Sequence, residues 1–358
     1  MGGEGTGVIA ERCAAQLLSG PRAGSALEVT RRLLAVQGQD PRGFRLAIRA
    51  RSSGLTAADV DRALTADRSM IITWLNRGTL HLVAADDYWW LHALTAPVLT
   101  AGVTRRLAQE GIESAAEADR GVAVIAAALA ADGPLTRADL AERLASAGIS
   151  IRGQALVHLL GLASLRGLIV RGPMAARRHA FALVSDWLGA PPARFAPGSF
   201  DRDIAVAELA RRYLAGHGPA GERDLAKWAG LPLRDARRGL AAIAAELRQR
   251  DDGLAELAGS SRAGRPAAER QDLPRPLLLG AFDPLLLGWA DREPILGPHR
   301  QIVTVNGLFR PFALAGGRAV GTWSLAGDGV AVAPFAPLPD DVGAALRDDA
   351  ADVMRFLR

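Results

Sequence analysis

The sequence is poor in residues that support several common kinds of chemistry. Of its 358 residues only Cys13 is a cysteine, which excludes an internal disulfide framework and is typical of a reducing compartment. Lys227 is the only lysine, so Schiff-base chemistry at a side-chain amine would depend on that residue. Apolar runs are broken by Arg, Asp or Gly well before the roughly 18 residues that a membrane span needs. These absences predict a cytoplasmic protein that does not span a membrane.

Motifs for metals and nucleotides are also missing. The six histidines form no H-x-x-x-H spacing and the chain has no C-x-x-C, so a structural zinc is not expected. There is no G-x-x-x-x-G-K-[ST] for a phosphate-binding loop and no G-x-S-x-G for a serine nucleophile. We therefore expect neither a metal nor a cofactor.

Charge is more informative about a partner. Lys and Arg together number 43 against 38 Asp and Glu, which gives a net charge of +5, and all but one of the 43 are arginine. A GC-rich genome produces part of such a bias, but a pI near 10.4 still favours a polyanionic partner. Arginine also contacts phosphates with two parallel hydrogen bonds, which lysine cannot do. The composition therefore favours a polyanion, such as double-stranded DNA, over an acidic small molecule.

An internal repeat indicates the domain organisation. The pattern G-P-x-x-x-x-D-L-A occurs at 133–141 and again at 218–226, and L-T-A-A-D-V at 55–60 is a fainter copy. Around the copy at 133–141, helical periodicity and extended stretches follow the order helix, helix, helix, hairpin, which is typical of a winged helix. The predicted elements are helices at 119–130 and 152–166 and extended segments at 168–171 and 179–184.

These patterns predict a mainly α fold with small β wings (α+β): three tandem winged-helix units and a strand-rich C-terminal part, together forming a basic DNA-binding cleft. The predicted parts are residues 1–115, 116–190, 199–272 and 273–358, with a Pro-rich linker at 190–198. Further expected elements are a first hairpin at 71–83 that turns at Arg77-Gly78, helices near 203–215, 221–229, 233–247 and 341–357, and turns at Asn306-Gly307 and Gly316-Gly317.

The stretch A-V-Q-G-Q-D-P-R at 35–42 breaks an amphipathic helix predicted over 25–36. Two interpretations fit it: a polar helix end with a turn, or two amide side chains, Gln37 and Gln39, aimed at a ligand. Arginines follow at helical spacing on the next helix, where we expect them to line a phosphate track beside the amides. The predicted DNA contacts are Arg42, Arg45 and Arg49 here, Arg177 and Arg178 on the second wing, and Arg234, Arg237 and Arg238 on the third unit.

Four fragments carry a family resemblance: Q-G-Q-D-P at 37–41, R-G-T-L-H-L at 77–82, A-F-D-P-L-L-L-G at 281–288 and G-R-A-V-G-T-W at 317–323. In this order they resemble the winged-helix DNA glycosylases, the family of the azinomycin-resistance glycosylase, over essentially the whole chain. The resemblance implies that Gln37 and Gln39 are catalytic, with Gly38 at a position where the family often has an apolar residue. It also implies a β-hairpin that enters the DNA cleft, for which the 301–323 region, with Asn306 and Arg310, is the candidate.

The implied activity is that of a monofunctional DNA glycosylase, acting as a monomer. It would hydrolyse the N-glycosidic bond of N7-alkylated purines and unhook interstrand crosslinks of the azinomycin B type, giving repair and self-resistance to the antibiotic. Glutamine cannot deprotonate water at neutral pH. An N7-alkylated purine is already cationic and leaves as a neutral base, however, so positioning water and stabilising charge at the sugar would suffice.

Two other classes of protein remain open from the sequence. Winged helices are most often transcriptional regulators, although three units with no obvious dimerisation helix count against a simple operator-binding dimer. A protein that sequesters the free alkylating drug is the third interpretation. Excision of a base from damaged duplex DNA distinguishes the enzyme from both.

Overall fold

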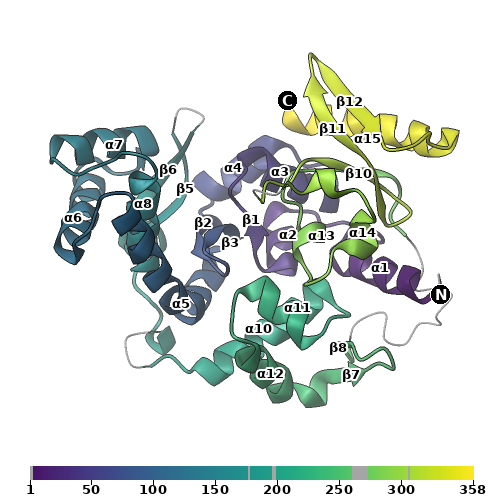
Figure 1. The fold of residues 1–358 in the computed structure, drawn as a ribbon, viewed down its shortest axis with the longest axis horizontal. Helices are drawn as coiled ribbons and strands as arrows, with labels where there is room; N and C mark the ends of the chain where they lie inside the picture. Colours follow the sequence, from purple (N-terminus) through teal and green to yellow (C-terminus); the bar gives the residue numbers. More distant parts are fainter. Residues whose placement is uncertain (1–2, 176–177, 196–198, 260–272, 305–306) are drawn as a thin grey trace. The chain divides into compact units, whose positions relative to one another are not determined.

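The computed structural model describes residues 3–175, 178–195, 199–259, 273–304 and 307–358. The fold is mixed α/β, about half helical, with small antiparallel sheets (Figure 1). The chain divides into two compact units, which are described separately: the first contains residues 1–60 and 206–358, and the second residues 61–205. Within the described residues, no helix is both long enough and apolar enough to cross a membrane.

The second unit is built on two β-hairpins and a group of helices. Its strands lie in the order β3-β2-β5-β6-β4. Helices α5 to α8 enclose an apolar core that includes Ile125, Leu140, Leu159 and Phe181. The elements, starting with the helix that leads into this unit, are α4 Ala57–Thr65, β2 Met70–Leu75, β3 Thr79–Ala84, α5 Tyr88–Gln109, α6 Ala115–Asp132, β4 Leu135–Thr136, α7 Arg137–Ser146, α8 Ala155–Leu165, β5 Ile169–Ala175, β6 Arg178–Leu183 and α9 Val184–Leu188.

Both predicted hairpins of this unit are confirmed. Strands β2 and β3 are antiparallel from Met70 opposite Ala84 to Leu75 opposite Thr79, and the turn uses Gly78 at a φ of 77°. Strands β5 and β6 pair from Ile169 opposite Leu183. The helix predicted over 152–166 begins later than expected, at Ala155, and ends at Leu165.

The first unit contains a four-stranded antiparallel sheet with the strand order β12-β11-β10-β9. Helix α15 packs against β9 and β12, and α3 packs against β9. The predicted turn at Gly316-Gly317 is confirmed, because both glycines have positive φ and join β10 to β11. The elements are α1 Gly3–Ala15, α2 Ala26–Leu33, β1 Val36–Gln37, α3 Pro41–Arg51, β9 Leu277–Leu279, α13 Pro284–Leu287, α14 Glu293–Leu296, β10 Phe312–Ala315, β11 Arg318–Ala326, β12 Gly329–Pro334 and α15 Asp340–Leu357.

The same unit also holds three helices followed by a short hairpin: α10 Arg202–His217, α11 Glu222–Ala229, α12 Leu233–Ala242, β7 Leu247–Gln249 and β8 Ala255–Leu257. The helix predicted over 233–247 was too long, since α12 ends at Ala242 and the chain becomes a strand at Leu247. The helix predicted over 25–36 likewise ends at Leu33, where Leu34 takes a φ of 64° that an α-helix cannot continue.

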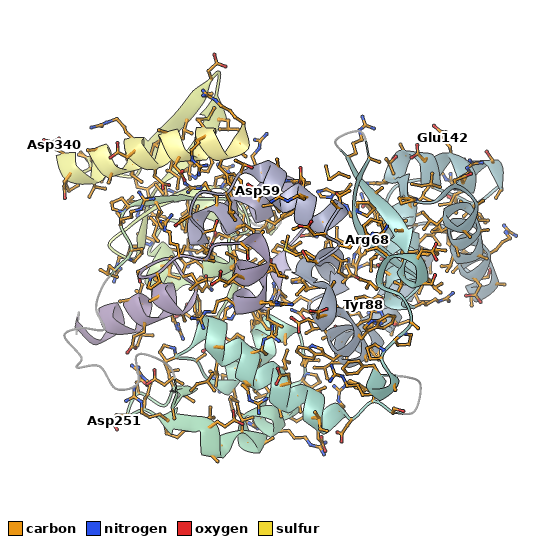
Figure 2. All side chains as sticks on the ribbon, turned by 180° about the vertical axis from the view of Figure 1, so that it is seen from behind. Asp59, Arg68, Tyr88, Glu142, Asp251 and Asp340 are labelled. Carbon is orange, nitrogen blue, oxygen red and sulfur yellow. The ribbon has the colours of Figure 1, made fainter. Side chains whose placement is uncertain are left out.

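The aspartate shared by the three repeat copies starts a helix in each of them. Its carboxylate accepts a hydrogen bond from the backbone nitrogen three residues earlier, at 2.8 Å in Asp59, 2.8 Å in Asp139 and 3.0 Å in Asp224 (Asp59 is labelled in Figure 2). This is the reciprocal contact of a capping box, which satisfies backbone N–H groups that have no partner inside a helix. The repeat is therefore a helix-start signal, and the division into winged-helix units stays a prediction.

Candidate active site and DNA-contacting residues

The two glutamines lie directly after α2, where β1 ends. Gln37 is the last residue of the strand and is buried, with only 7% exposed. Gln39 is exposed, and its Oε1 accepts a hydrogen bond of 3.1 Å from Nε2 of Gln37. Oε1 of Gln37 is buried and has no hydrogen-bond partner among the described residues.

The amides do not cap the neighbouring helices. Helix α3 is capped by Asp40, whose Oδ1 accepts hydrogen bonds from the backbone nitrogens of Arg42 at 2.8 Å and Gly43 at 3.0 Å. Pro41 occupies the first helical position, where its missing N–H costs nothing. Asp40 and Pro41 thus fix the start of α3. Helix α2 already ends with Leu34 as its C-cap residue, so Gln37 and Gln39 lie beyond the helix end that they were suggested to cap.

Helix α3, which follows the Gln-Gly-Gln segment, packs closely against the backbone at Gly280 and Ala281. A Cβ atom added to Gly43 would lie 2.4 Å from the carbonyl oxygen of Ala281, and one added to Gly280 would lie 2.9 Å from Cβ of Leu46. Backbone therefore packs closely at these two positions, which only glycine permits. The A-F-D-P fragment thus begins in contact with the helix that follows the Gln-Gly-Gln segment.

Two arginines of α3 are structural. The guanidinium of Arg49 pairs with Asp349 at 2.8 Å and donates to the carbonyl of Leu278 at 2.8 Å, and its side chain is 1% exposed. Arg51 pairs with the fully buried Asp283 at 2.8 Å. The prediction that Arg49 contacts DNA is therefore wrong, because a phosphate cannot reach a guanidinium that is buried and already neutralised.

The other two arginines of α3 differ in exposure. Arg45 is 8% exposed, donates to the carbonyl of Pro41 at 2.6 Å and lies over the ring of Phe44, so in this conformation it does not face solvent. Arg42 is exposed. Of the three arginines predicted to line a phosphate track along α3, only Arg42 is exposed.

The predicted arginines outside α3 are exposed where the structure describes them. On α12 the side chain of Arg234 is 86% exposed and that of Arg237 is 60% exposed, and Arg237 pairs with Glu222 at 2.7 Å. Arg238, Arg178 and Arg310 are exposed as well. Arg177 and Asn306, which were also predicted to contact DNA, lie outside the described residues.

Near Arg310 the chain makes a small antiparallel bridge between Val303 and Phe309. Leu308, beside the bridge, is 59% exposed, which is unusual for a leucine in this chain. The base of this turn is anchored because the Phe309 ring packs on Phe282 of the A-F-D-P segment, with 5.2 Å between centroids. The sequence marked the turn through the adjacent Gly307, but Leu308 itself carried no signal that set it apart from other leucines.

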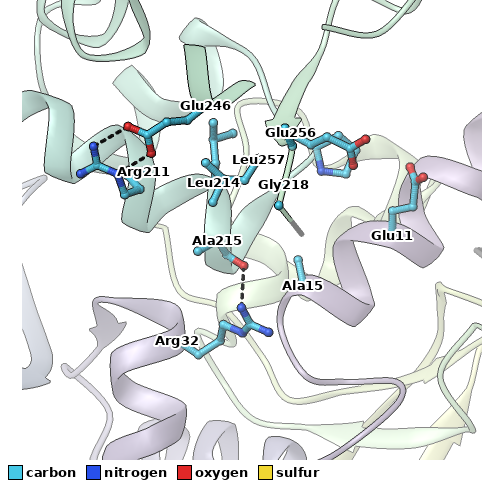
Figure 3. Close-up of a pocket in the computed structure, with 13 residues that line it drawn as sticks. Glu11, Ala15, Arg32, Arg211, Leu214, Ala215, Gly218, Glu246, Glu256 and Leu257 are labelled. Carbon is cyan, nitrogen blue, oxygen red and sulfur yellow. Dashed lines mark hydrogen bonds and ion pairs between the residues drawn. The ribbon is translucent and has the colours of Figure 1, made fainter. Parts of the chain in front are cut away.

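A cavity of about 590 Å³ lies elsewhere in the first unit, between α1, α2, α10 and the β7–β8 hairpin (Figure 3). Its charged groups are engaged: Arg211 pairs with Glu246 at 2.7 Å, and Arg250 pairs with Glu11 at 2.7 Å. None of the residues lining it belongs to the Gln-Gly-Gln segment. The cavity therefore contributes nothing to the chemistry of the glutamines.

Lys227 lies exposed on α11, as expected for a solvated lysine. Cys13 is fully buried on α1. In the part of the chain that is described, no three His, Cys, Asp or Glu side chains gather in a way that could hold a metal ion.

The chain belongs to the DNA glycosylase AlkZ-like family, whose sequence profile matches residues 30–356. It is similar to the interstrand DNA cross-link repair glycosylase of Streptomyces sahachiroi, with 30% identity over 352 residues that cover 92% of this chain and 90% of the relative. The solved structure of Streptomyces sahachiroi DNA glycosylase AlkZ matches 99% of this chain and 97% of its own with a TM-score of 0.77 at 26% identity. The family resemblance drawn from the four fragments is confirmed.

Proposed function

We propose that this chain is a monofunctional DNA glycosylase that hydrolyses the N-glycosidic bond of N7-alkylated purines and unhooks interstrand crosslinks of the azinomycin B type. The observation that carries the proposal is the state of the two amides. Gln37 gives its N–H to Gln39 and keeps a buried carbonyl oxygen without a partner among the described residues, so this oxygen is prepared to accept a hydrogen bond. In the enzyme, the donor is the attacking water.

Hydrolysis of the glycosidic bond needs only a positioned water and stabilisation of the charge that develops on the sugar. The bond between C1′ and the purine nitrogen breaks with its electron pair passing to the base, so the cationic N7-alkylpurine leaves as a neutral molecule. The oxygen of water forms the new bond to C1′, and its proton goes to solvent. Oε1 of Gln37 orients the water, and the amide dipole of Gln39 stabilises the positive charge that develops on the sugar.

The exposed cations and the Leu308 turn supply the DNA contacts. Arg42, Arg310 and the three arginines of α12 contact phosphates, because an exposed guanidinium binds the backbone without regard to sequence. Leu308 is proposed as an apolar wedge at the duplex, since inserted leucines unstack base steps in other DNA-bound proteins. Its anchor on Phe282 links the wedge to the segment that also supports α3.

The helix–helix–helix–hairpin order of α6 to β6, and again of α10 to β8, supports the winged-helix interpretation of these segments. The two third helices differ, because α8 is almost wholly apolar and buried whereas α12 exposes its arginines. We therefore place DNA contact on α12 and assign α8 to the core. Arg178, in the hairpin formed by β5 and β6, then contacts DNA without a further contact from α8.

Incubation with a duplex that carries N7-methylguanine tests the function. The expected products are free 7-methylguanine and an intact abasic site that alkali then cleaves. Borohydride should trap no protein–DNA adduct, and Lys227→Ala should leave excision unchanged, because Lys227 is exposed and is not needed for attack by water. A trapped adduct would overturn the water mechanism. Absence of excision together with tight binding to one short sequence would favour a winged-helix regulator.

A further inference from the structure

The chain reaches Gln37 through a strained turn. Leu34, directly after the last residue of α2, has a φ of 64° and a ψ of −47°, a conformation that residues with a side chain rarely adopt. The backbone N–H of Ala35 donates to the carbonyl oxygen of Leu33 at 2.8 Å, which closes the rare kind of γ-turn that has a positive φ at its centre. Strained backbone persists only where its surroundings hold it, and it gathers at functional sites. The turn lies three residues before Gln37, so whatever holds the turn also bears on that amide.

The end of α10 packs directly against the end of α2. A Cβ atom added to Gly216 would lie 2.2 Å from the carbonyl oxygen of Arg32 and 3.4 Å from Cα of Leu33. Only a residue without a side chain allows this approach of two backbones. Leu33 and Leu34 are both fully buried, so the turn would uncover two leucines if it moved outward.

Two arginines join the same two helix ends. Nη1 of Arg32, in the last turn of α2, donates to the carbonyl oxygen of Ala215 at 3.3 Å (Figure 3). Nη2 of Arg212, on α10, donates to the carbonyl oxygen of Arg31 at 3.2 Å. Carbonyl groups in the last turn of a helix have no partner within that helix, and each guanidinium supplies one to the other helix. These hydrogen bonds and the glycine contact hold the residues that lead into the strained turn.

We propose that Leu34, Gly216 and Arg32 are positioning residues for the glutamine pair; the inference rests on the proposed glycosylase function. Packing against α10 holds Leu34 in the strained conformation, and the turn sets the place from which Gln37 presents its carbonyl oxygen to water. Misplacement of a reacting group by about 1 Å can slow a reaction about a hundredfold. The turn therefore acts on the rate of the chemical step and not on the affinity for DNA.

The key variant is Gly216→Ala, which places a methyl group where the two backbones meet. Gly239→Ala is the matched control, because Gly239 is also a helical glycine and its added Cβ would lie 2.4 Å from the carbonyl oxygen of Val206, elsewhere on α10. Both variants should lower the melting temperature to a similar extent. Single-turnover release of 7-methylguanine from duplex is measured at saturating enzyme, so that differences in duplex affinity do not enter the rate. We expect Gly216→Ala to be slower by about tenfold or more with unchanged duplex affinity, and Gly239→Ala to stay within about twofold of the wild type.

A second pair of variants keeps the inference testable if Gly216→Ala does not fold. Arg32→Met removes the donor to Ala215, whereas Arg32→Lys keeps a donor. The saturating rate should fall in Arg32→Met and stay closer to the wild type in Arg32→Lys. Because Arg32 is exposed, duplex affinity is measured beside the rate, and a change in affinity alone would contradict a positioning role.

The outcomes separate this inference from the proposed function. Equal slowing in the two glycine variants would show that lost stability, and not the strained turn, controls the rate. A folded Gly216→Ala that excises at the wild-type rate, or an Arg32→Met that does so when Gly216→Ala is unfolded, would also overturn the inference and leave the glycosylase assignment intact. A wild type without any excision would instead remove the function on which the inference rests.

Discussion

Helices α3 and α12 both carry closely spaced arginines but use them in opposite ways. Both are short, both carry arginines three and four residues apart, and sequence alone assigns both to a DNA backbone. In α3 the guanidinium groups of Arg49 and Arg51 are buried against Asp349 and Asp283, whereas α12 exposes Arg234, Arg237 and Arg238. Arginine spacing therefore shows only which residues share a helix face. The carboxylates packed against that face decide whether its arginines stabilise the fold or stay available to DNA.

The largest expected effect is on the α3 side. Arg49→Ala leaves Asp349 buried without its main partner, so the free energy of unfolding should fall by about 3–5 kcal/mol in a denaturant titration. Arg42→Ala, on the exposed start of the same helix, is the matched control and should change stability by less than about 0.5 kcal/mol. Equal, small losses of stability for both variants would mean that the buried pair adds nothing to the fold and that the comparison fails.

The next effect is on the α12 side and concerns binding. Replacing Arg234, Arg237 and Arg238 together by glutamine should leave the melting temperature unchanged, because all three are exposed. The affinity for undamaged duplex should fall, and the slope of log affinity against log salt should become shallower by about 0.9 for each phosphate that the variant no longer neutralises. An unchanged salt slope would show that α12 does not face DNA.

A smaller effect, an increase in duplex affinity, is expected when an α12 arginine is released from its ion pair. Arg237 is held by Glu222, and its hydrogen bond lowers the pKa of Glu222 below the ordinary value. Glu222→Gln should release Arg237 for a phosphate and raise duplex affinity a few-fold, with a steeper salt slope. Stability should hardly change because exposed pairs contribute about 0–1 kcal/mol. Weaker binding in this variant would mean that the ion pair itself positions α12.

The smallest effect is a dependence on pH next to the buried pair. Burial acts to raise the pKa of Asp352, but the hydrogen bond from Arg355 and the charge of Arg49 outweigh it and hold the pKa below its ordinary value. A lowered folded-state pKa stabilises the protein above about pH 4 and loses that contribution as the pH falls through the folded value. Asp352→Asn should therefore melt below the wild type at pH 7 and approach it near pH 3. A constant difference would remove the ionic explanation.

Features encoded locally could be predicted from the sequence. The first hairpin, the turn at Gly316-Gly317 and the repeated helix starts depend on residues within a few positions of one another. Contacts between distant segments could not. Asp349 lies 300 residues from Arg49, and no local pattern pairs them. The glutamines were found because two amides interrupt an apolar pattern, but the burial of Gln37 and its unpaired oxygen depend on the folded chain.

The most direct test of the central claim is single-turnover release of 7-methylguanine from duplex DNA by the wild type and by the Gln37→Ala, Gln39→Ala double variant. The mechanism predicts that the variant keeps its melting temperature and duplex affinity but loses excision, because the amides cap no helix and act only on water and sugar. Excision at the wild-type rate in the folded variant would contradict the claim. Unfolding of the variant would contradict it equally, since the two amides would then be part of the fold.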